Sequence, residues 1–291
     1  MLRRPRSSFA AVLIAAVLVS GAAVALGVGP ATVGQPAERL DVPSRTLVTS
    51  DSAWLGIKTY GAVDAVQGFD HQLVLASCRR RVSTSCRNYD GSVPPTSYAE
   101  VARRGDTFDT LVQAAGYDDS DHDFVSDLTR TIDLTRQHGY RRVVWVTLRE
   151  NVSYDSTGHI GYGAVYERNN DALREIAATG LYPELIVADF AEYARHRPEW
   201  FAADGIHIRR LGAYAAADYL SRKMAFLDGR ACPQPVAPGA AAQDPCPDPD
   251  VTGPIADVAA LYPTTQAGPD SGLILVWEGA SSWPAPPWWE R

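Results

Sequence analysis

The chain has 291 residues, of which 46% are hydrophobic and 21% charged, and its formal net charge is −7. This composition is ordinary for a globular protein, with one large domain or two small ones. The negative charge argues against nucleic acid or an anionic membrane surface as the main partner. No glycine-rich phosphate-binding loop is present, which argues against a nucleotide-binding protein of that kind.

The first 29 residues have the pattern of a signal peptide or membrane anchor. Arginines precede an apolar run from Phe9 to about Val28. Ala23 and Ala25 offer a cleavage site, but the run is also long enough to span a bilayer. We expect an extracytoplasmic protein, either secreted after cleavage, which we favour, or attached to the membrane through this segment. Residues 30–44, rich in proline, glycine and polar side chains, are predicted to be a linker.

Short β-prone runs then alternate with segments of helical period. Strands are predicted at 46–49, 72–75, 108–114, 142–148 and 185–188, and helices at 53–66, 98–104, 123–138, 166–179, 189–196 and 209–227. This alternation predicts an α/β fold with a parallel sheet covered on both faces. Binding and catalytic sites in such sheets lie at the carboxyl ends of the strands.

Four cysteines agree with export into an oxidising compartment. We favour pairing of Cys78 with Cys86 and of Cys232 with Cys246 among the three possible connectivities. Neither pair has the spacing of a zinc site and no histidine cluster completes one, so we expect no metal and no cofactor.

A polar turn, Ser50-Asp51-Ser52, follows the first predicted strand and precedes a helix-compatible segment. A serine at such a turn can expose its hydroxyl, and the next helix N-terminus offers N–H groups to a developing oxyanion. Taken alone, Asp51 and Ser52 are explained as readily by helix capping.

A second stretch, Asp204-Gly205-Ile206-His207, lies far downstream. On a loop, this spacing lets the Asp204 carboxylate reach one nitrogen of the His207 ring while the other nitrogen faces a serine. By themselves, these two residues are equally a helix cap and a surface histidine.

Together with Gly116-Tyr117-Asp118-Asp119, these stretches resemble the SGNH (GDSL-type) serine hydrolases, whose blocks read Gly-Asp-Ser, Gly-x-Asn-Asp and Asp-x-x-His in this order. The resemblance covers about residues 47–220. It implies a flavodoxin-like α/β/α sandwich with a five-stranded parallel sheet over residues 45–228. It also implies Ser52 as nucleophile, His207 as base and Asp204 as the group that orients the histidine.

The sequence departs from the family pattern where the oxyanion would bind. The resemblance implies N–H donors from Ser52 and from a residue after the second strand, plus an asparagine side chain. Here Ser50 replaces the first glycine, Cys78 stands roughly where a glycine follows the second strand, and Asp118 replaces the asparagine. An ionised carboxylate repels an oxyanion, so Asp118 must be protonated, turned away, or held by one of the arginines at 79–81.

The sequence therefore predicts an exported serine esterase that cleaves O-acyl esters, chiefly O-acetyl esters, of carbohydrate or cell-envelope material. The expected partner is a small-molecule or polysaccharide ester. Arg79 and Tyr117 are substrate-binding candidates, although the arginine-rich loop could equally be a solvated one. The alternatives are an O-acyltransferase with the same three residues and a catalytically impaired glycan-binding module.

Residues 229–291 lie outside the resemblance and are predicted to form a proline-rich, cysteine-paired appendage. We favour an appendage packed on the core, because the run 273–277 is too apolar to remain exposed.

Overall fold

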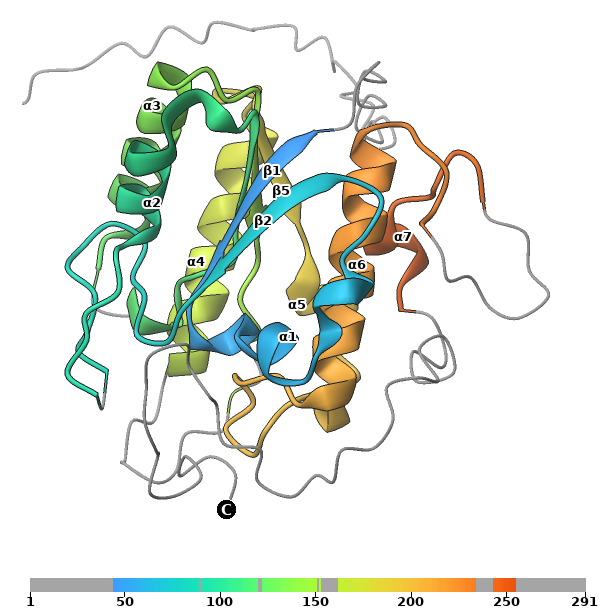
Figure 1. Cartoon of the computed structure of the whole chain (residues 1–291), viewed down its shortest axis with the longest axis horizontal. Helices are drawn as coiled ribbons and strands as arrows, with labels where there is room; N and C mark the ends of the chain where they lie inside the picture. The colour runs from blue at the N-terminus through green and yellow to red at the C-terminus, as the bar shows by residue number, and fades with distance from the viewer. Residues whose placement is uncertain are drawn as a thin grey trace, which may run out of the picture. The chain divides into compact units, whose positions relative to one another are not determined.

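A five-stranded parallel sheet lies at the centre of the fold (Figure 1). A computed structural model of the chain describes residues 44–88, 90–119, 122–150, 152, 162–233 and 243–254. The strand order is β2-β1-β3-β4-β5, and the strands are β1 (Arg45–Ser50), β2 (Asp70–Leu75), β3 (Thr110–Gln113), β4 (Arg142–Val146) and β5 (Leu185–Ala188). The predicted α/β class and the five parallel strands are confirmed.

The inner strands are buried on both faces, and their side chains alternate between two hydrophobic clusters. One face carries Leu47, Leu111 and Val143, and the other carries Val48, Val112 and Val144. All six are completely buried. A strand that is buried on both faces is a continuous apolar run, which is why the sequence indicates these strands clearly.

Helices cover both faces (Figure 1). On one side the helices are α2 (Ser97–Arg104), α3 (Phe124–Gln137) and α4 (Tyr162–Ala178). On the other side they are α1 (Gly56–Thr59), α5 (Phe190–Tyr193), α6 (Arg210–Leu227) and α7 (Pro249–Thr252). No helix in these described stretches is long and apolar enough to cross a membrane. The predicted signal or anchor segment lies outside the described residues.

The helix predicted at 53–66 is wrong as a continuous element. The structure has a 3-10 turn at Ser52–Trp54, then α1, then a second 3-10 turn at Ala62–Ala65. Gly61 adopts a left-handed conformation with φ 69°, which ends α1. Helix α4 begins four residues before the predicted start, and β3 and β4 are shorter than predicted.

A buried lysine holds residues 243–254, the longer of the two described parts of the appendage. The Lys223 ammonium lies 2.9 Å from Asp248 Oδ1 and 2.6 Å from Asp250 Oδ2. Asp250 also accepts hydrogen bonds from the Tyr219 hydroxyl and from the Asp189 N–H at the end of β5. A disulfide between Cys232 and Cys246 closes this segment. The run 273–277, on which the expectation of a packed appendage depended, lies outside the described residues.

Replacing the buried lysine should loosen this attachment. We expect Lys223→Ala to lower the free energy of unfolding by about 3 kcal/mol, because the Asp248 and Asp250 carboxylates both lose a buried cation. The exposed Lys58 on α1 is the control, and Lys58→Ala should change it by less than about 0.5 kcal/mol. Urea denaturation measures both variants, and equal stabilities would contradict this account of the appendage.

Candidate active site

Three chain segments meet at the carboxyl edge of the sheet, and the Asp51 carboxylate joins two of them. Asp51 follows β1 and is completely buried. Its Oδ1 accepts a hydrogen bond from the Ala53 N–H at 2.9 Å. Its Oδ2 accepts from the N–H groups of Gly116 (2.7 Å) and Tyr117 (2.9 Å), which follow β3. The turn that carries Ser52 is therefore fixed to the loop that carries Asp118.

Burial raises the pKa of Asp51, and the N–H groups of Gly116, Ala53 and Tyr117 act in the opposite direction. The sequence indicates only the local capping role of this carboxylate. Its Oδ2 accepts N–H groups more than sixty positions away in the sequence, and no local sequence pattern predicts such a contact.

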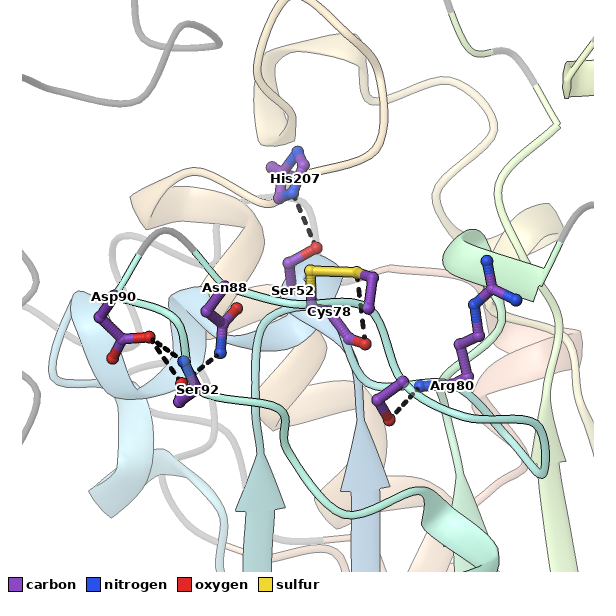
Figure 2. The surroundings of a disulfide bond; sticks show 9 residues. Ser52, Cys78, Arg80, Asn88, Asp90, Ser92 and His207 are labelled. Atoms are coloured by element: carbon purple, nitrogen blue, oxygen red, sulfur yellow. Dashed lines mark hydrogen bonds between the residues drawn. A yellow bond between two sulfur atoms is a disulfide. The ribbon is translucent and has the colours of Figure 1, made fainter.

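Ser52, His207 and Asp204 form a chain of hydrogen bonds. The Ser52 Oγ lies 2.9 Å from His207 Nε2 (Figure 2), and His207 Nδ1 lies 2.7 Å from Asp204 Oδ2. The other Asp204 oxygen accepts the N–H groups of Ile206 and His207. Burial by itself would raise the pKa of Asp204, but the hydrogen bond and charge of His207 and these N–H donors bring it below the ordinary value. A carboxylate that stays ionised holds the Nδ1 proton, which leaves Nε2 free to accept the serine proton.

The loop that carries Asp204 and His207 is anchored to the Ser52 turn. The Ile208 N–H donates to the Ala53 carbonyl at 3.2 Å. A Cβ on Gly56 would lie 2.7 Å from Ile208 Cγ1 and 2.8 Å from the Ile208 carbonyl oxygen. Only a residue without a side chain allows this close approach.

Arg149, just after β4, supports the same loop from the other side. Its guanidinium donates to the Gly205 carbonyl at 2.8 Å and lies 4.1 Å from the centre of the Phe201 ring. It is 6% exposed and forms no ion pair with a carboxylate in the described part of the chain. The sequence analysis did not identify Arg149, because a single arginine after a strand has no distinctive spacing.

Cys78 occupies a conformation that favours glycine. Its φ is 63°, and it is the single residue other than glycine with a positive φ among the described residues. A disulfide joins it to Cys86, and the Cys86 N–H donates to the Cys78 carbonyl. The two disulfides are the pairs expected from the sequence. Figure 2 shows the Ser52 and Cys78 segments beyond the carboxyl ends of two neighbouring strands.

The backbone N–H groups of Ser52 and Cys78 form no hydrogen bond within the described part of the chain. Both segments follow adjacent strands, since Ser50 of β1 is paired with Leu75 of β2. These are two of the three predicted oxyanion donors.

The third predicted donor, Asp118, lies in a short turn at Tyr117–Asp119. Its Oδ2 is buried and has no hydrogen-bond partner within the described part of the chain. None of the arginines at 79–81 binds it: Arg79 is paired with Glu100, Arg81 with Asp119 and Asp127, and Arg80 contacts His122. Burial, with the nearby charges of Asp51 and Asp119, raises the pKa of Asp118 to about 7.

The two substrate-binding candidates are engaged elsewhere. The Arg79 guanidinium is buried and lies 3.4 Å from Glu100, so it does not present a free charge to a substrate. The Tyr117 hydroxyl accepts the Arg149 N–H at 2.6 Å, and its ring packs edge-on against Tyr166. Burial raises the pKa of Tyr117, so the phenol stays neutral. No group of three or more potential metal ligands occurs in the described stretches.

Comparison with known proteins adds little to this geometry. No protein-family model and no curated protein matches the chain. A proposed arylesterase from Agrobacterium tumefaciens aligns with a TM-score of 0.41 and 12% identity, over 60% of this chain and 94% of that protein. A gut microbial diltiazem-metabolizing enzyme aligns with a TM-score of 0.36 and 13% identity, over 67% of this chain and 49% of that protein. Likenesses this low assign no function.

The geometry of Asp51 predicts that even an amide cannot replace its carboxylate. In Asp51→Asn, one of the two accepting oxygens becomes an NH2 group facing N–H donors, so at least one buried N–H loses its partner. We expect the free energy of unfolding to fall by about 3 kcal/mol, measured by chemical denaturation.

Asp123→Asn is the matched control for this variant. Asp123 is an exposed helix cap that accepts the N–H groups of Val125 and Ser126, and asparagine caps equally well. Its substitution should therefore be nearly neutral. Equal effects of the two substitutions would mean that Asp51 only caps its own turn.

Proposed function

We propose that this chain is an exported serine esterase of the SGNH type, which cleaves O-acyl esters through an acyl-enzyme. The observation that carries the proposal is the hydrogen-bonded chain from the Ser52 hydroxyl through the His207 ring to the Asp204 carboxylate. It lies at the carboxyl edge of a parallel sheet, where α/β proteins place their sites. This arrangement has the nucleophile, the base and the orienting acid in the order that acyl transfer requires.

In the proposed reaction, Ser52 Oγ attacks the ester carbonyl carbon while His207 Nε2 takes the hydroxyl proton. The carbonyl oxygen becomes an oxyanion, and the N–H groups of Ser52 and Cys78 donate to it. When the C–O bond of the ester breaks, His207 returns the proton to the leaving alcohol. Water then attacks the acyl-serine by the same steps in reverse, which releases the carboxylic acid and restores Ser52.

The substrate class is proposed from chemistry and compartment. Two disulfides support an oxidising, extracytoplasmic location. The Arg79 guanidinium is paired with Glu100, so it does not offer a free charge to an anionic substrate. Short O-acyl esters, chiefly O-acetyl groups on carbohydrate or cell-envelope material, are the substrates we propose for such an enzyme.

Loss of the serine hydroxyl should abolish the reaction. Ser52→Ala should lower the rate of 4-nitrophenyl acetate hydrolysis by roughly 10⁶-fold, because the nucleophile is gone while the fold is kept. A fluorophosphonate probe should label the wild-type protein at Ser52 and leave the variant unlabelled, as read by mass spectrometry of the peptide. Ser126→Ala, in an exposed serine of α3, is the control and should keep full activity. An unlabelled wild-type protein, or turnover retained by Ser52→Ala, would exclude this mechanism.

The conformation of Cys78 generates a separate prediction about the oxyanion. Without the disulfide, an alanine at position 78 pays about 1–2 kcal/mol to keep φ positive, whereas glycine adopts it freely. We therefore expect the double variant Cys78→Gly/Cys86→Ala to keep a kcat on acetyl esters roughly 5–30-fold above that of Cys78→Ala/Cys86→Ala. Both variants lack the disulfide, so the comparison isolates the backbone at position 78. Equal kcat values would mean that the Cys78 N–H is not an oxyanion donor.

A further inference from the structure

Five cationic side chains are buried in the described part of the chain, and Arg149 differs from the other four. Each of those four is paired with at least one carboxylate: Arg79 with Glu100, Arg81 with Asp119 and Asp127, Arg142 with Asp228, and Lys223 with Asp248 and Asp250. Arg149 is equally buried but forms no ion pair within the same described residues. A buried charge without a counter-ion costs stability, so the charge of Arg149 needs an explanation other than a salt bridge.

Aromatic and acidic groups surround the guanidinium of Arg149. Its central carbon lies 4.1 Å from the centre of the Phe201 ring. Burial lowers the pKa of Arg149, and the negative charges of Asp204 and Glu199 act in the opposite direction. The Asp204 carboxylate is already bonded to the His207 ring and to two backbone N–H groups. The guanidinium is therefore a positive charge that acts on the proposed orienting acid without contacting it.

Arg149 also connects two segments of the candidate site. Its backbone N–H donates to the Tyr117 hydroxyl at 2.6 Å, and the Tyr117 N–H donates to Asp51, the residue before Ser52. Its guanidinium donates to the Gly205 carbonyl at 2.8 Å, within the loop that carries the proposed base. A continuous series of residues joined by hydrogen bonds therefore runs from the serine turn, through Arg149, to the histidine loop.

The histidine loop is held on both sides of His207. After the histidine, the Ile208 N–H donates to a carbonyl of the serine turn at 3.2 Å. Before the histidine, the Gly205 carbonyl accepts the hydrogen bond from Arg149. His207 Nε2 lies 2.9 Å from the Ser52 hydroxyl. Losing either anchor frees one side of the loop, so the ring can move away from the serine.

We propose that Arg149 is a positioning residue, and that its guanidinium holds the histidine loop in the geometry that brings His207 Nε2 to the Ser52 hydroxyl. This inference rests on the proposed esterase function. Arg149 transfers no proton, and it acts through the Gly205 carbonyl on the proposed base and through its charge on the orienting acid. Because its charge has no ion-pair partner, we expect it to serve activity rather than stability.

Replacing Arg149 by methionine separates these two roles. Arg149→Met removes a hydrogen bond and also an unpaired buried charge, which act on stability in opposite directions, so the urea midpoint should stay close to that of the wild type. The kcat on an acetyl ester should fall by about 100-fold and KM should change by less than about threefold, because a displaced base slows the chemical step and not binding. Arg149→Lys keeps the charge and an N–H donor and should restore part of the lost kcat.

Arg197→Met is the matched control. Arg197 also lies over an aromatic ring, 5.6 Å from the centre of Trp200, but its guanidinium lies 3.7 Å from the Glu199 carboxylate. Its replacement should leave kcat at the wild-type value. A wild-type kcat in Arg149→Met, or a lysine variant no faster than the methionine variant, would overturn the inference. A urea midpoint that falls as far as that of Asp51→Asn would also overturn it, because Arg149 would then serve the fold.

Fluorophosphonate labelling of Ser52 distinguishes a failure of this inference from a failure of the proposed function. A wild-type protein that is not labelled and does not hydrolyse esters would exclude the esterase itself. A wild-type protein that is labelled and active, with an Arg149→Met variant that is equally active, would exclude only the role of Arg149.

Discussion

The buried carboxylate of Asp51 is the contact on which the geometry of the site depends. The carboxyl ends of parallel strands lie at one edge of the sheet. The segments beyond these ends are no longer aligned by the backbone hydrogen bonds between strands. The Asp51 carboxylate aligns two of these segments by accepting three backbone N–H hydrogen bonds, one from its own turn and two from the loop after β3. The Ile208 N–H and the Arg149 guanidinium then fix the histidine loop against the same turn. The serine, the histidine and the turn of Asp118 are therefore held relative to one another by short, buried polar contacts.

The fold could be predicted from the sequence because the features that determine it are local. Strands buried on both faces appear as apolar runs, such as Leu47–Val48 and Val143–Val144, and the alternation with helices determines a parallel sheet. The break in the helix predicted at 53–66 could not be predicted, since a left-handed Gly61 and the contact between Gly56 and Ile208 decide it. The contact between Gly56 and Ile208 joins residues about 150 positions apart.

The site could be predicted only in part for the same reason. The spacing of Asp204 and His207 indicates that they can bond to each other, and the order of the blocks indicates which serine they meet. The sequence does not show that Arg79 turns inward to Glu100, that Tyr117 binds the Arg149 N–H, or that Cys78 has a positive φ. Each of these is decided by a partner on another segment. Arginine and tyrosine are ambiguous in this respect, because the same side chains serve buried polar networks and substrate contacts.

The buried charges around Ser52 differ in how they are compensated by hydrogen bonds and opposite charges. Asp204 is held ionised by His207 and two N–H groups, and Arg81 lies between Asp119 and Asp127. Arg149 has no ion-pair partner in the described residues, but it rests on the Phe201 ring and the Gly205 carbonyl. Protonating Asp204 would break several of these contacts at once, and they keep its pKa below the ordinary value. Asp118 Oδ2 and Asp119 Oδ1 are buried without a hydrogen-bond partner in the described part of the chain, and burial raises the pKa of the two acids to about 7 and about 6. The same packing that holds the serine, histidine and acid in one geometry thus leaves two neighbouring carboxyls, Asp118 and Asp119, whose pKa values lie close to neutral.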